Sequence, residues 1–144
     1  MRLVFDTDVF IKYRDSITDD DIRKMALSIV VLFELTATTT SAADLRHFEN
    51  LKRQFEKDGL LLFPTRSDWW ECAKAVSRLR HGEKSVSHGR TPKDPKARRL
   101  QNDALIARTA QVNGCYVVTA NVKDFQRLKP YLKFWLVSAD EYFR

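Results

Sequence analysis

Four acidic residues follow short apolar runs or share an apolar helix face, in segments that lie far apart along the chain. They are Asp6, Glu34, Asp103 and Asp124. Carboxylates repel one another strongly in a low-dielectric site, so bringing several together calls for a neutralising cation. If the fold gathers these four side chains, the chemistry that they predict is a divalent metal site.

The ligand types narrow the choice of metal. Hard divalent cations prefer oxygen ligands, and Mg²⁺ takes few carboxylates because it keeps several of its waters. Carboxylates without a paired histidine or cysteine favour Mg²⁺ or Mn²⁺ over Zn²⁺. One or two such ions activate a water and stabilise the leaving oxygen in phosphodiester cleavage. The alternative is that some of the acids are helix caps or solvated side chains.

Short apolar runs alternate with helical patterns along the chain. Strands are predicted at residues 3–5, 27–31, 60–63, 115–119 and 134–137. Helices are predicted at residues 9–14, 41–59, 67–79 and 96–113, with others beginning at Thr18, Glu34 and Ser138. This alternation predicts βαβ units around a parallel sheet. We therefore expect an α/β fold in a single domain over residues 1–144.

Three of the acids come shortly after a predicted strand, namely Asp6, Glu34 and Asp124. In parallel sheets the ligand crevice lies outside the carboxyl ends of the strands, so these side chains are expected at one edge of the sheet.

Asp103 is expected to point inward from a helix. It shares a helical face with Leu100 and Ala107, at spacings of three and four residues. A half-buried carboxylate needs a partner, and a metal cation or a hydroxyl such as that of Thr119 can supply one.

Composition and charge limit the classes of protein that the chain can be. Hydrophobic residues at 44% and charged residues at 31% are typical of a soluble globular protein. Cys72 and Cys115 show no CxxC spacing, which favours a reduced, cytoplasmic setting. The apolar N-terminal run is broken by Asp6 and Asp8, unlike a signal peptide. No apolar segment approaches the roughly 20 residues that span a membrane.

The net charge of +6 is concentrated in one segment. Residues 74–99 hold nine Lys or Arg against Glu83 and Asp94, a local net charge of +7. Such a segment suggests a polyanionic partner, most simply nucleic acid. The alternative is a solvated helix and loop without a partner.

The four acids lie in four ordered motifs. Residues 3–7 read LVFDT, 31–35 read VLFEL, 102–107 read NDALIA and 118–125 read VTANVKDF. This ordered set, which spans nearly the whole chain, resembles the PIN-domain nucleases, including the VapC-type toxins. Each motif alone is short, and the order makes the resemblance specific.

The resemblance implies a three-layer α/β/α sandwich with a central, mostly parallel sheet of four to five strands. It implies a metal-dependent endoribonuclease that hydrolyses RNA by a metal-activated water, with Mg²⁺ or Mn²⁺ as cofactor. The implied catalytic and metal-binding residues are Asp6, Glu34, Asp103 and Asp124, supported by Thr7, Thr119 and Asn121. Asn121 is an alternative to Asp124 as the fourth group. A cognate antitoxin and a homodimer are implied by the resemblance alone.

Two segments depart from the family pattern. Residues 36–41 are rich in β-branched side chains, which predicts that the helix of Glu34 ends early. The loop at residues 81–95 is long and basic, and it leads into the helix of Asp103. The candidates for phosphate contact are Arg78, Arg80, Lys84, Arg90, Lys93, Arg98 and Arg99. Four aromatic residues favour core or interface packing over base stacking: Phe33, Trp69, Trp70 and Trp135.

Two other classes of function stay open at this point. Residues 3–9 also resemble the first motif of haloacid-dehalogenase-type phosphatases, in which the residue at Asp6 would attack phosphate. The downstream acidic pair GDxxxD of those enzymes does not occur in the sequence. The second class is a non-catalytic RNA-binding or protein-interaction domain, which gains nothing from a negative cluster.

Overall fold

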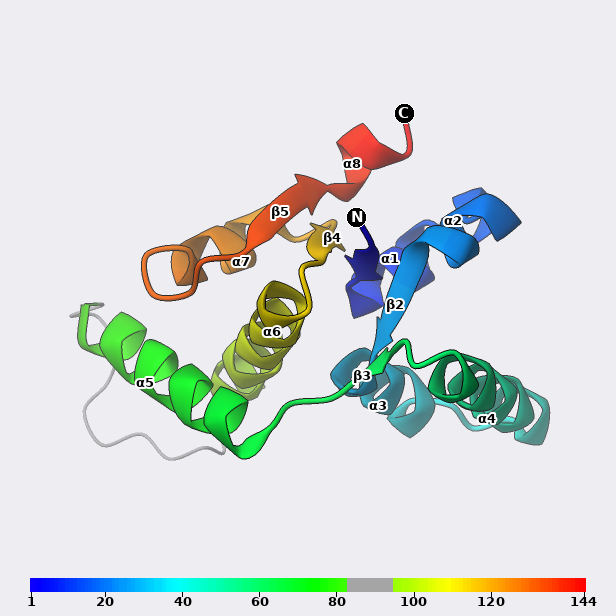
Figure 1. Cartoon of the computed structure of the whole chain (residues 1–144), viewed down its shortest axis with the longest axis horizontal. Helices are drawn as coiled ribbons and strands as arrows, with labels where there is room; N and C mark the ends of the chain where they lie inside the picture. The colour runs from blue at the N-terminus through cyan, green and yellow to red at the C-terminus, as the bar shows by residue number, and fades with distance from the viewer. Residues whose placement is uncertain (83–94) are drawn as a thin grey trace.

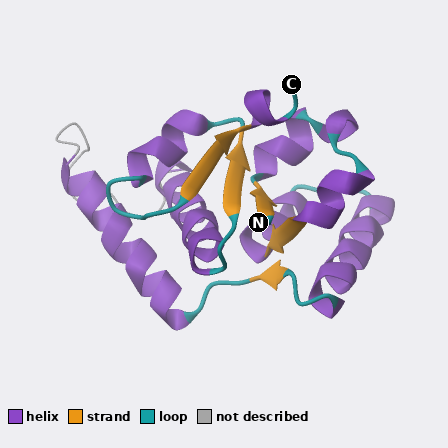
Figure 2. Cartoon of the chain, turned by 45° about the horizontal axis from the view of Figure 1, so that its top comes forward, coloured by secondary structure: helices purple, strands orange, loops and turns teal. Residues whose placement is uncertain are grey.

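The computed structural model describes residues 1–82 and 95–144. Five strands form one sheet in the order β3-β2-β1-β4-β5, and every neighbouring pair is parallel. The strands are β1 (Leu3–Phe5), β2 (Met25–Ser28), β3 (Leu61–Leu62), β4 (Tyr116–Thr119) and β5 (Trp135–Ser138). The first strand lies at the centre of the sheet, with helices around it (Figures 1 and 2).

Helices cover both faces of this sheet. They are α1 (Thr7–Lys12), α2 (Asp19–Lys24), α3 (Ile29–Ala37), α4 (Ala42–Lys57), α5 (Arg66–Gly82), α6 (Pro95–Val112), α7 (Val122–Leu128) and α8 (Ala139–Tyr142), with a 3₁₀ turn at Arg14–Ser16. Val4 packs into a cluster with side chains of α5, α6 and α7. The next residue, Phe5, packs on the opposite face with side chains of α1, α4 and α8. The predicted three-layer α/β/α sandwich with a parallel sheet is confirmed.

Several helix ends follow the expected local chemistry. The Thr18 hydroxyl accepts a hydrogen bond from the Asp21 amide and so caps α2. The β-branched run at residues 36–41 ends α3 early, at Ala37, as predicted. Gly114 follows α6 with φ 66°, a left-handed conformation that favours glycine. No helix in the ranges 1–82 and 95–144 is long and apolar enough to cross a membrane.

The strand predicted at residues 27–31 is wrong in its second half. The strand β2 ends at Ser28, and the apolar residues after it form the first turns of α3. The Ser28 hydroxyl accepts hydrogen bonds from the amides of Val30 and Val31, at 3.1 and 3.4 Å, and so starts the helix. A short buried apolar run fits a helix or a strand equally well. Glu34 therefore lies within α3, instead of at the start of a helix that follows the strand directly.

The helix α5 buries the face that carries Asp68, Cys72, Ala75 and Leu79. Trp69 and Trp70 lie outside this face, and Trp70 is 65% exposed. Phe33 and Trp135 are exposed as well. Core packing, one of the two predictions for these four aromatic residues, is therefore wrong, and interface packing stays a prediction.

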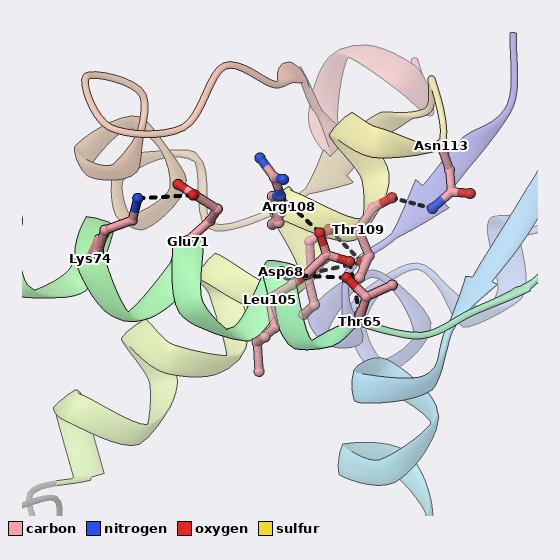
Figure 3. Close-up of polar contacts among 9 residues, drawn as sticks. Thr65, Asp68, Glu71, Lys74, Leu105, Arg108, Thr109 and Asn113 are labelled. Atoms are coloured by element: carbon pink, nitrogen blue, oxygen red, sulfur yellow. Dashed lines mark hydrogen bonds and ion pairs between the residues drawn. The ribbon is translucent and has the colours of Figure 1, made fainter.

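Asp68 sets the orientation of α5 (Figure 3). Its carboxylate accepts hydrogen bonds from the Thr65 amide and from Arg108 Nε of α6, both at 2.9 Å. The Asp68 amide in turn donates to the Thr65 hydroxyl at 3.2 Å, which completes a helix cap. Burial raises the pKa of Asp68, but the hydrogen bonds from Thr65 and Arg108 outweigh it and hold the pKa below its usual range. This buried ion pair joins α5 to α6.

The Asp68→Ala substitution tests the ion pair between α5 and α6. We expect the free energy of unfolding to fall by about 2 kcal/mol, because Arg108 loses its partner and α5 loses its cap. The matched control is Lys74→Ala, which removes the exposed ion pair with Glu71 on the same helix and should cost under about 0.5 kcal/mol. Urea denaturation measures both, and equal losses would contradict the assignment.

Candidate acidic site

Asp6 lies at the carboxyl end of β1 and is held from two sides. Its carboxylate accepts a hydrogen bond from the Thr7 amide at 2.8 Å and caps α1. The Thr119 hydroxyl at the end of β4 donates to its other oxygen at 2.9 Å. The side chain is buried, with 6% of its residue exposed. The neighbouring strands β1 and β4 therefore fix the Asp6 carboxylate between them.

Thr7 brings Glu34 to the same place. The Thr7 hydroxyl donates to Glu34 Oε1 at 2.7 Å, while its amide donates to Asp6. Residues of α1 and α3 are thereby joined, and two predicted acids share one supporting residue.

Asp124 is connected to the site through Asn121. The Asn121 side chain donates to Asp124 Oδ2 at 2.6 Å, and the Asn121 amide donates to the Thr119 hydroxyl at 2.9 Å. Thr119 is thus bonded on one side to Asp6 and on the other to Asn121. Arg127 also lies 4.0 Å from Asp124, whose side chain is partly exposed. Thr119, which was expected as a partner of Asp103, donates its hydrogen bond to Asp6 instead.

Asp103 points inward from α6, as its helical face predicted. Burial and the charges of Asp6, Asp124, Glu34 and Asp8 together raise its pKa to about 8. The other three acids of the predicted quartet are therefore near enough for their charges to act on Asp103.

The pKa of Asp6 is also raised, to about 7. Burial is the largest cause and the charge of Asp8 the next; hydrogen bonds from Thr119 and Thr7 oppose them. The charge of Glu34 adds to the rise. These two carboxyls of the site therefore keep part of their protons near neutral pH when no cation is present.

Asp8 is a fifth acid of the site, which the sequence motifs did not assign. It lies in the first turn of α1, and its Oδ1 accepts a hydrogen bond from the Ala120 amide at 3.3 Å. The spacing of two residues from Asp6 was its only signal in the sequence. Its contact with the segment after β4 comes from the fold.

The donor chemistry of this site fits a divalent cation. The charges that act most strongly on Asp6 and Asp103 are those of other carboxylates, and all the candidate ligands present oxygen. A bound cation of charge +2 would relieve this repulsion. Within residues 1–82 and 95–144, no three His, Cys, Asp or Glu side chains converge on one point where they could hold an ion. The site therefore fits by charge and ligand type, without a preformed set of three ligands.

The basic candidates divide between the surface and the segment outside the described residues. Arg78 on α5 is exposed, as are Arg98 and Arg99 on α6, and Arg80 is half-buried. Lys84, Arg90 and Lys93 lie outside the described residues. Arg98 and Arg99 share α6 with Asp103, so two basic side chains lie on a helix that enters the site.

Solved structures share this architecture. No protein-family model matches the chain, and no curated protein does. A chain of VapBC-1 from nontypeable Haemophilus influenzae matches with a TM-score of 0.64 and 18% identity, over 97% of this chain and 99% of that one. VapBC from Salmonella typhimurium gives 0.61 and 16%, over 96% and 98%. FitAcB from Neisseria gonorrhoeae gives 0.58 and 16%, over 93% and 95%.

The chain has a PIN-like fold. At these identities the likeness shows the fold alone, and it assigns no role to the residues of the site. In this PIN-like fold the acids lie where the strand order reverses: β1, β2 and β3 run to one side, and β4 and β5 to the other. Such a switch point is where open α/β sheets bind their ligands.

The raised pKa values predict that the metal-free protein loses stability as pH rises. The folded state keeps protons on Asp6 and Asp103 up to about pH 7 and 8, whereas the unfolded chain releases them near the ordinary pKa of 3.8. Between these values the folded state binds more protons, so the free energy of unfolding falls with rising pH.

The substitution Asp103→Asn removes one of these charges. We expect it to raise the melting temperature of the metal-free protein at pH 8 by about 3 °C or more, and to change it little at pH 4.5. Calorimetry with a chelator present measures this, with Asp15→Asn at the surface as control. A destabilised variant at pH 8 would contradict the prediction.

Proposed function

We propose that this chain is a metal-dependent endoribonuclease and the toxin of a toxin–antitoxin pair. The observation that supports it most is the gathering of Asp6, Glu34, Asp103 and Asp124 at the switch point of a PIN-like sheet. This arrangement matches the acidic quartet that the sequence motifs implied.

Each acid has a proposed role in phosphodiester hydrolysis. Mg²⁺ or Mn²⁺, when bound, supplies a Lewis acid for the phosphate and a more acidic water. Asp6 and Asp103 hold the cation, since they are the buried pair whose charge it neutralises. Glu34, oriented by the Thr7 hydroxyl, accepts the proton of the attacking water. Asp124 completes the site, with its orientation set by Asn121.

Two observations favour a nuclease over the other classes of function. A binding module for RNA gains nothing from burying acids whose mutual repulsion costs stability. The phosphatase would need the downstream acidic pair GDxxxD, which the sequence lacks.

The proposed partners are RNA, a small antitoxin and a second copy of the chain. Solved structures that share the fold include VapBC and FitAcB, which supports the antitoxin, whereas the homodimer follows from the family resemblance. The exposed residues Arg78, Arg98 and Arg99 are proposed to contact RNA phosphates. Both cysteines are buried and unpaired, and burial raises the pKa of the Cys72 thiol to about 12. Such unreactive thiols fit the proposed cytoplasmic setting.

RNA cleavage tests the activity directly. We expect the protein to cleave RNA with Mg²⁺ or Mn²⁺ and to stop when EDTA is added. Asp6→Asn and Asp103→Asn should each slow cleavage at least about 100-fold, because each weakens the charge that holds the cation. Asp15→Asn is the matched control, an exposed acid outside the site.

Three results would contradict the nuclease. RNA cleavage that continues after EDTA is added would contradict the proposed metal dependence. Metal-independent RNA binding without cleavage would favour the binding module. A phosphoaspartate at Asp6, trapped with beryllofluoride, would favour the phosphatase.

Induced expression tests the toxin role. We expect growth arrest and new RNA ends with the wild-type chain, and neither with Asp103→Asn. Sequencing of RNA 5′ ends measures the cleavage position. Co-expression of a short reading frame adjacent to the gene should restore growth, and growth unaffected by the wild-type chain would count against a toxin.

A further inference from the structure

We propose that Asp8 is a positioning residue, which holds the segment 119–121 in place across the acidic site. The relevance of this segment to catalysis rests on the proposed nuclease function, whereas the positioning itself is a property of the metal-free protein. Asp8 lies outside the four sequence motifs, which assigned no role to it.

Three consecutive residues at the end of β4 and just after it each contact a different acid. The Thr119 hydroxyl donates to Asp6, the Ala120 amide donates to Asp8, and the Asn121 side chain donates to Asp124. A segment of three residues thus touches three carboxylates. The Asp8 contact is the one that binds the backbone of this segment; the other two involve side chains.

The backbone contact controls the side-chain contacts on either side of it. The Thr119 hydroxyl donates to Asp6 and accepts from the Asn121 amide at 2.9 Å, so its rotamer depends on where the backbone at 120–121 lies. If the Ala120 amide is released, Thr119 keeps its place in β4 through its pairing with Ser138, and Asp6 keeps its hydrogen bond from the Thr7 amide. The Asn121 amide can then leave the Thr119 hydroxyl, and the contact between the Asn121 side chain and Asp124 loses its fixed position.

Asp8 does not act on the site by neutralising charge. Its negative charge acts on Asp6 and Asp103 in the unfavourable direction. A carboxylate at this place therefore costs stability in the metal-free protein. The hydrogen bond that Asp8 accepts from the Ala120 amide, at 3.3 Å, is the compensating contact that the structure shows.

The first test is amide hydrogen exchange of the metal-free protein, followed by NMR. Asp8→Ala removes the acceptor and should speed exchange of the Ala120 amide at least about 10-fold. Asp8→Asn keeps an acceptor oxygen and should stay within about 3-fold of wild type. Asp15→Ala is the control for loss of an acid near the same helix. Unchanged protection of Ala120 in Asp8→Ala would overturn the proposal.

The second test is calorimetric titration with Mn²⁺. Both variants lose the Asp8 charge and should weaken binding, but we expect Asp8→Ala to weaken it at least about 3-fold more than Asp8→Asn, because only the conservative variant preserves the position of the segment. Equal weakening by both variants would mean that Asp8 acts through its charge, and would overturn positioning. If the wild type binds no Mn²⁺, the proposed metal site fails, and the exchange result alone decides whether Asp8 holds the segment.

Discussion

Repulsion among buried carboxylates is the constraint on which the arrangement of the site depends. The described donors that hold Asp6 and Glu34 are neutral: the amide and hydroxyl of Thr7 and the hydroxyl of Thr119. Asp124 is held by the Asn121 side chain and also lies 4.0 Å from Arg127. Neutral donors orient a carboxylate without cancelling its charge. Burial and the charges of neighbouring acids therefore raise the pKa values of Asp6 and Asp103, and a bound cation would relieve this repulsion.

A buried acid on the neighbouring helix α5 has the opposite environment, with a cation beside it. Asp68 is also buried, but it is paired with Arg108 and its pKa is lowered. Arg108 and Asp103 both belong to α6, five residues apart, which places them about 140° apart around the helix. One side of α6 thus carries a structural ion pair, and another carries Asp103, for which the described part of the chain shows no ion pair. The structural acid is paired with a cation, and the candidate metal ligand is surrounded by other acids.

The sequence predicted what local pattern decides, and missed what distant contacts decide. Asp6 at a strand end and Asp103 on an apolar helix face were readable, because strand and helix periodicity place them directly. Glu34 was placed in the wrong setting, since a buried apolar run does not distinguish helix from strand and Ser28 breaks it. The buried face of α5 depends on the partner of Asp68, which lies 40 residues away on α6. Asp8 could not be assigned because its partner is a backbone amide 112 residues later.

The strand order explains why these contacts meet where they do. The chain leaves β1 toward β2 and β3, and later returns to start β4 on the other side of β1. The helices that follow β1 and β4 consequently pack on opposite faces: Val9 of α1 lies in one cluster and Phe125 of α7 in the other. The two segments diverge between the end of β1 and the end of β4, which is where open α/β sheets bind their ligands. The hydrogen bond between Asp8 and Ala120 joins the start of α1 to the segment before α7, across that divergence.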